Sequence, residues 1–100
     1  MAKNRVFGGK TIVEEPEVLN AIAHYRKTVY RFEDAYDALI WYLSHEGEGI
    51  RGECIILEGV AYYLYAQRAD KLAGTPRLRV VFTSNNYQIT IVELQVVPTK

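Results

Sequence analysis

The stretch Arg77-Leu-Arg-Val-Val-Phe-Thr-Ser-Asn-Asn-Tyr-Gln-Ile-Thr-Ile-Val-Glu-Leu-Gln-Val-Val97 carries the clearest structural signal in the chain. Two runs rich in β-branched and aromatic residues flank Ser84-Asn85-Asn86. Asparagine tolerates positive φ, so this trio suits a tight turn. We predict a β-hairpin with a two-residue turn at Asn85-Asn86. The predicted cross-strand pairs are Ser84 with Tyr87, Phe82 with Ile89, and Val80 with Ile91.

The side chains of this hairpin divide between two faces, because alternate residues of a strand point the same way. One face is apolar and holds Leu78, Val80, Phe82, Ile89 and Ile91. The other is polar and holds Arg77, Arg79, Thr83, Gln88 and Thr90. Arg77, Arg79, Thr83 and Gln88 form a candidate anion-binding site. The plainer alternative is two arginines on a solvated face.

The alternation reverses after Ile91, where Val92, Leu94 and Val96 are apolar while Glu93 and Gln95 are polar. A strand cannot exchange its faces without an extra residue, so we predict a β-bulge near Ile91-Val92. The alternative is a strand end that is buried on both sides.

Length and composition fit one domain, because the chain has 100 residues of which 49% are apolar. We expect a flexible segment over residues 1–9 and a single domain over residues 10–100. The first ten residues lack an apolar h-region, so a signal peptide is not expected. One cysteine, Cys54, excludes an internal disulfide framework and indicates a cytoplasmic location.

Charge is unevenly distributed although the formal net charge is zero. Residues 11–58 carry four basic and ten acidic residues, whereas residues 59–100 carry five basic and two acidic ones. A polarised surface could steer a charged partner, or the charges could simply be solvated. Zero net charge argues against strong non-specific binding to nucleic acid.

Helices are predicted between Pro16 and His45, after a short strand at Lys10–Val13. Glu14-Glu15-Pro16-Glu17 is typical of a helix start. Apolar residues then recur at helical spacing: Val18, Leu19, Ile22, Tyr25 and Val29, followed by Phe32, Ala35, Tyr36, Leu39, Ile40 and Leu43. We favour two antiparallel helices with a break near Thr28–Arg31, with one long helix as the alternative. The second should end by Gly47.

Strand-like residues occupy Cys54–Leu57 and Val60–Tyr65, with Gly59 between them, as one bent strand or two short ones. The predicted fold class is therefore α+β. A helical hairpin, or one long helix, packs on a small antiparallel sheet of three to five strands that ends in the C-terminal β-hairpin.

This order of elements resembles the RelE/ParE superfamily of bacterial toxin–antitoxin toxins. In that family a short strand and a helical hairpin precede three or four antiparallel strands with an Arg-aliphatic-x-aromatic stretch. The matching residues here are Pro76-Arg-Leu-Arg-Val-Val-Phe82 and Gln88–Val97. The resemblance covers about residues 10–97 and rests on pattern.

The resemblance implies a toxin that acts on translation, through the ribosome and mRNA, or on DNA gyrase, with a cognate antitoxin as its partner. Arg79 aligns with a family arginine and Lys71 lies near a strand lysine, so both would be catalytic in a ribonuclease. The expected C-terminal Tyr or His is absent after Lys100. This departure favours the gyrase-directed branch or a copy with another use. No cofactor is implied.

The tyrosines support a second hypothesis, a non-catalytic α+β domain that binds a partner or dimerises. Tyr62 and Tyr63 must point to opposite faces of a strand, and Tyr and Trp are enriched at interfaces. We predict that Trp41, Tyr62, Tyr63 and Tyr65 line such a surface; the alternative is sheet core and rim. His24, His45 and Cys54 have no metal-ligand spacing, so no metal is expected.

Overall fold

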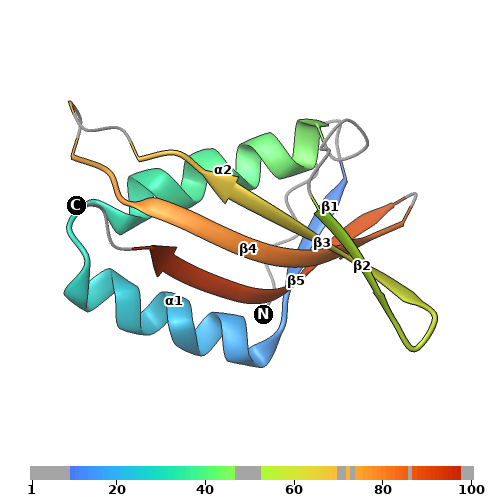
Figure 1. Ribbon diagram of the computed structural model, residues 1–100. Coiled ribbons are helices and arrows are strands. Elements are labelled where there is room, and N and C mark those ends of the chain that lie inside the picture. The colour runs from blue at the N-terminus through green and yellow to red at the C-terminus, as the bar shows by residue number, and fades with distance from the viewer. Residues whose placement is uncertain (1–9, 47–52, 70–71, 73, 86, 98–100) are drawn as a thin grey trace.

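The computed structural model describes residues 10–46, 53–69, 72, 74–85 and 87–97 (Figure 1). These ranges hold two helices and five strands in an α+β arrangement, as predicted. The elements are β1 (Thr11–Glu14), α1 (Pro16–Thr28), α2 (Phe32–Glu46), β2 (Glu53–Leu57), β3 (Val60–Gln67), β4 (Arg77–Ser84) and β5 (Gln88–Val97).

The five strands form one sheet in the order β1-β5-β4-β3-β2. Strands β2 to β5 are antiparallel, each to the next, whereas β1 lies parallel to β5. Residues 54–65 form two strands, not one bent strand. Glu58 and Gly59 both have positive φ, 52° and 80°, which is the backbone of the two-residue turn that suits a twisted hairpin.

The β4–β5 hairpin exists, but its predicted register is wrong. Ser84 pairs with Ile89, Phe82 with Ile91 and Val80 with Leu94, so the hairpin is centred one residue later than predicted. The side chain of Asn85 explains the shift. Its Oδ1 accepts hydrogen bonds from the backbone N–H groups of Tyr87 and Gln88, both at 2.8 Å. A side-chain oxygen thus takes the place of a backbone acceptor in the turn.

The predicted bulge is confirmed. Val81 pairs with Glu93 while its neighbour Phe82 pairs with Ile91, so Val92 is an extra residue on β5. The bulge lets Leu94 return to the buried face with Ile91. Because the turn is centred one residue later than predicted, Ser84 and Phe82 each pair with a β5 residue two positions later than predicted. A shift of two residues leaves each side chain on its predicted face.

The two predicted helices are confirmed, and they separate at residues 29–31. Arg31 has φ 55°, a left-handed conformation that no helix continues through. The six residues of the predicted apolar pattern on α2 are all buried: Phe32, Ala35, Tyr36, Leu39, Ile40 and Leu43. On α1, Val18 and Ile22 are buried but Leu19 is exposed.

The core lies between the helical layer and one face of the sheet. We call this sheet face the covered face and the opposite one the open face. The covered face contributes buried residues from three strands: Ile12 of β1, Leu78, Val80 and Phe82 of β4, and Ile89, Ile91 and Leu94 of β5. Tyr63 and Tyr65 of β3 pack against this core while remaining partly exposed. No described residue of β2 belongs to it.

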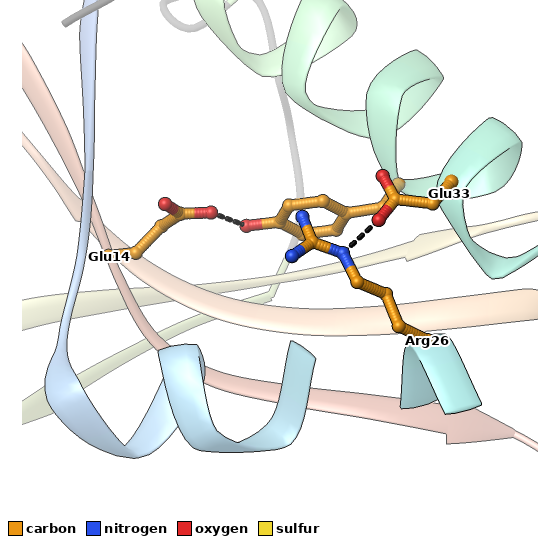
Figure 2. A network of polar contacts seen from close by, with 4 residues as sticks. Glu14, Arg26 and Glu33 are labelled. Atoms are coloured by element: carbon orange, nitrogen blue, oxygen red, sulfur yellow. Dashed lines mark hydrogen bonds and ion pairs between the residues drawn. The ribbon is translucent and has the colours of Figure 1, made fainter. Parts of the chain in front are cut away.

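Polar contacts tie β1 to α2 and join the two helices to each other (Figure 2). The hydroxyl of Tyr36 on α2 donates to the carboxylate of Glu14 on β1. Arg26 of α1 forms an ion pair with Glu33 of α2. The backbone N–H of Lys10 donates to the carbonyl of Ser44 near the end of α2, at 3.0 Å. Both ends of β1 are therefore held to α2, through Lys10 before the strand and Glu14 at its last residue.

Within the described ranges, neither helix has the length and apolar content needed to cross a bilayer.

Candidate interaction surface

Strand β2 forms an edge of the sheet and is the most exposed apolar segment among the described residues. All five of its residues, Glu53-Cys-Ile-Ile-Leu57, are exposed. Ile56 is 70% exposed and Leu57 is 58% exposed. In Figure 1 the β2–β3 hairpin extends beyond the two helices. An exposed apolar edge strand is a ready template for pairing with another polypeptide.

The register of the β2–β3 hairpin determines which backbone groups of β2 are free. Leu57 and Val60 flank the two-residue turn, and Ile55 pairs with Tyr62. Residues that flank such a turn exchange both hydrogen bonds, and the pattern alternates along the strand. Glu53, Ile55 and Leu57 therefore direct their N–H and C=O groups toward β3. Cys54 and Ile56 direct theirs toward the free edge.

An apolar patch continues from this edge onto the open face. We call it the open-face patch and define it as Ile55, Leu57, Val60, Tyr62, Leu64 and Val81. These residues are cross-strand neighbours, because Ile55 pairs with Tyr62, Leu57 with Val60, and Leu64 with Val81. Each is exposed or partly exposed. Among the residues that the structure describes, no helix packs on this face, and no residue of the patch belongs to the hydrophobic core.

The four residues of the predicted anion site lie on the open face as the alternation required. Arg77 and Arg79 of β4 are exposed. Thr83 of β4 pairs with Thr90 of β5, and Gln88 lies two residues before Thr90 on the same face of β5. Arg79 donates to Gln95 Oε1, and Gln95 Nε2 donates to Glu93 Oε1 at 3.0 Å. Gln88 donates to Thr90 Oγ1 at 2.9 Å. The side chains therefore form two separate polar groups, and binding of an anion there stays a prediction.

The three tyrosines of β3 point to both faces of the sheet, as the strand geometry required. Tyr62 lies on the open face. Tyr63 and Tyr65 lie on the covered face, where Tyr63 stacks on Phe82 with ring centroids 5.7 Å apart and Tyr65 stacks on Tyr42 at 5.2 Å. Burial raises the pKa of Tyr65, with a smaller contribution from Tyr42. Only Tyr62 of the three adds to the open-face patch.

Trp41 lies on the outward side of α2 and is 59% exposed. Its ring stacks on the imidazole of His45, with ring centroids 4.2 Å apart. His45 Nδ1 lies 2.8 Å from the carbonyl oxygen of Trp41. Trp41 and the open-face patch are therefore on different layers of the molecule and cannot belong to one small interface.

The remaining predicted site residue, Lys71, lies outside the described residues, as do Lys100 and residues 1–9. His24, His45 and Cys54 come from α1, α2 and β2. The described residues hold no group of three His, Cys, Asp or Glu side chains arranged for a metal ion.

The sequence pattern identified the β2 residues as a strand but gave no sign that they form an exposed edge. A run such as Cys-Ile-Ile-Leu is also typical of a buried central strand. The sequence signal that bears on this question is the short turn Glu58-Gly59 after β2. A two-residue hairpin turn there predicts that β3 is one neighbour of β2.

No family model matches the chain, and no curated protein and no solved structure matches it either.

Proposed function

We propose that this chain is a non-catalytic protein-binding domain that takes up an extended partner segment at the free edge of β2. The observation that carries this proposal is the exposed apolar strand β2, with the N–H and C=O groups of Cys54 and Ile56 facing outward. Strand addition supplies affinity through main-chain hydrogen bonds and specificity through alternate side chains. The single cysteine, exposed as a free thiol, suits the cytoplasm as the place of action.

The open-face patch supports the same proposal. A partner strand beside β2 would place alternate side chains on the open face, next to Ile55 and Leu57. Those side chains would extend the apolar surface across the edge, so that apolar partner residues lose water contact together with the patch. A partner segment with apolar residues at alternate positions therefore fits this site.

The test separates main-chain pairing from side-chain contact. Peptides are selected from a displayed random library on the immobilised full chain, and their affinity is measured by fluorescence anisotropy. Ile56→Pro removes an N–H that faces away from β3, so the sheet keeps its ladder. We expect it to weaken peptide binding at least about tenfold, because edge hydrogen bonds are lost and the ring obstructs pairing.

Ile56→Val is the matched control, because it keeps the N–H with a side chain close to proline in size. It should bind the same peptides within about twofold. Equal affinity of Ile56→Pro and Ile56→Val would show that the peptides do not pair with this edge, and the proposal would fail.

A RelE/ParE-like toxin module is the second candidate. It is supported by the order of elements, a short strand, a helical hairpin and then antiparallel strands, and by the outward position of Arg79 on β4. Fixed cations on the sheet would stabilise phosphate charge in a ribonuclease. Its partner would be an antitoxin that covers Arg77 and Arg79.

Growth of a bacterial culture after induction tests this candidate. The unmodified chain should arrest growth, Arg79→Ala should not, and Lys27→Ala on the exposed side of α1 should behave as the unmodified chain. Normal growth with all three, while the protein is folded in the cells, would contradict the toxin candidate.

A further inference from the structure

We propose that the occupant of the β2 edge is β2 of a second copy of this chain, paired antiparallel about a two-fold axis at Ile55. This inference rests on the proposed function, because it requires the edge to accept a strand. It adds the identity of the partner and the register of the pairing.

Self-pairing of β2 is restricted to a few registers. Within β2, only Cys54 and Ile56 direct their N–H and C=O groups away from β3. In an antiparallel pair of two β2 strands, these residues must therefore lie opposite each other. Three antiparallel registers satisfy this condition. They place Cys54 opposite Cys54, Cys54 opposite Ile56, or Ile56 opposite Ile56 of the second copy. Only the middle register, centred on Ile55, pairs all five residues of Glu53–Leu57.

Side chains also match in this register. Ile55 faces Ile55 of the second copy as a non-hydrogen-bonded pair, in which side chains are closest. Cys54 faces Ile56, so both contacts on the covered-face side are apolar. Each Glu53 faces a Leu57, and no acid lies directly opposite another acid, an arrangement that would be destabilising.

The two-fold axis runs perpendicular to the sheet, because that rotation reverses the strand direction and keeps each face on its own side. The two helical layers therefore lie on one side of a continuous ten-stranded sheet. The two open-face patches meet on the other side, with Ile55 at their centre. An isologous contact of this kind closes after two copies and leaves no further β2 edge for a third.

The predicted association is weak and reversible. Strand addition over five residues buries little surface, below the roughly 1,200 Å² in total that stable interfaces exceed. We expect a monomer–dimer equilibrium with a dissociation constant in about the 10 μM to 1 mM range. Sedimentation velocity of the unmodified chain across that range should show the mean mass rising toward twice that of one chain.

Cysteine cross-linking tests the register directly. In Cys54→Ser/Ile55→Cys, the two thiols lie on the axis with Cα atoms about 4.5 Å apart, within the range of a disulfide. In Cys54→Ser/Ile56→Cys, and in the unmodified chain with Cys54, symmetry-related thiols lie about 8 Å apart, beyond that range. Mild oxidation should therefore cross-link the first variant and leave the other two proteins monomeric on a non-reducing gel.

The cross-linking and sedimentation results together test both the dimer and its register. Cross-linking through position 55 with a concentration-dependent mass supports the proposal. Preferential cross-linking through Cys54 or position 56 overturns the register. A chain that stays monomeric up to about 1 mM overturns the second copy. If the chain stays monomeric but Ile56→Pro loses binding of the selected peptides, β2 still accepts a strand from another partner. The proposed strand-accepting edge and the proposed dimer can therefore fail independently.

Discussion

The two edges of the sheet differ in how they are protected. Strand β1 has four residues, buries Ile12, and is tied to α2 through Glu14 and Tyr36. Strand β2 has five residues, all exposed, and no described residue of it joins the core. Short, covered edges are a common way to prevent unwanted pairing. The contrast indicates that β1 serves the fold, whereas β2 is available for a partner.

The largest expected effect is the difference between an isoleucine-to-alanine substitution in β1 and the same substitution in β2. Ile12→Ala should lower the free energy of unfolding by about 2–5 kcal/mol, because Ile12 is 4% exposed and its removal leaves a cavity. Ile56→Ala should lower it by no more than about 1 kcal/mol, through strand propensity alone. Urea denaturation of both variants measures the difference. Equal losses would mean that β2 is as much a part of the packed core as β1.

The hydrogen bond between Tyr36 and Glu14 contributes the next effect. Tyr36→Phe should destabilise the fold by about 1–2 kcal/mol, because the Glu14 carboxylate loses a partner in a partly buried position. Tyr87→Phe is the control, since Tyr87 is 81% exposed and should be nearly neutral. Thermal unfolding of the two variants compares them, and similar midpoints would show that this bond does not hold β1.

The turn of the β2–β3 hairpin should respond to backbone conformation alone. Gly59 has φ 80° and nothing lies within 4 Å of where a Cβ would be, so Gly59→Ala adds strain without a clash. We expect a cost of about 1 kcal/mol.

Glu58→Asn should have the opposite sign, a gain of a few tenths of a kcal/mol, because Asn favours the positive φ found at residue 58. Amide exchange should accelerate in β2 of Gly59→Ala and remain unchanged in β1. Acceleration at both edges would mean that β2 and β1 open together.

A smaller effect concerns the pKa of Tyr65. Burial raises that pKa in the folded state, so the folded chain holds the phenol proton more firmly than the unfolded chain. The associated stability is complete below the ordinary tyrosine pKa of about 10 and is lost as pH rises through the folded-state value. Between neutral and alkaline pH, the urea midpoint should therefore fall less in Tyr65→Phe than in the unmodified chain. An identical fall would contradict a titrating Tyr65.

Much of the fold follows from local sequence. The helices were predicted from apolar spacing, and the bulge at Val92 from the reversal of alternation between Ile91 and Leu94. The turn centre was displaced because a side-chain acceptor on Asn85 replaces a backbone one, which a residue-type rule does not resolve. The parallel pairing of β1 with β5 joins residues far apart in sequence, so no local pattern specifies it.

The candidate surface was harder to predict than the fold. Alternation placed Arg77, Arg79 and Tyr62 on the open face, but it could not show which strand lies at the edge. Strand order decides whether Ile55 and Ile56 are central or exposed, and that order depends on long-range pairing. The tyrosines drew attention to β3, although Tyr63 and Tyr65 pack on the covered face.

Residue-resolved amide hydrogen exchange tests the open β2 edge most directly. In dilute solution, Ile55 and Leu57 should be protected by β3 while Cys54 and Ile56 exchange freely. On β1 the N–H groups of Thr11 and Glu15 donate to β5, so by alternation the N–H of Ile12 points away from the sheet. Raising the protein concentration should slow exchange at Cys54 and Ile56 and leave the Ile12 amide unchanged. Equal protection of Cys54 through Leu57 in dilute solution, with no response to concentration or to a selected peptide, would contradict an edge that accepts a strand.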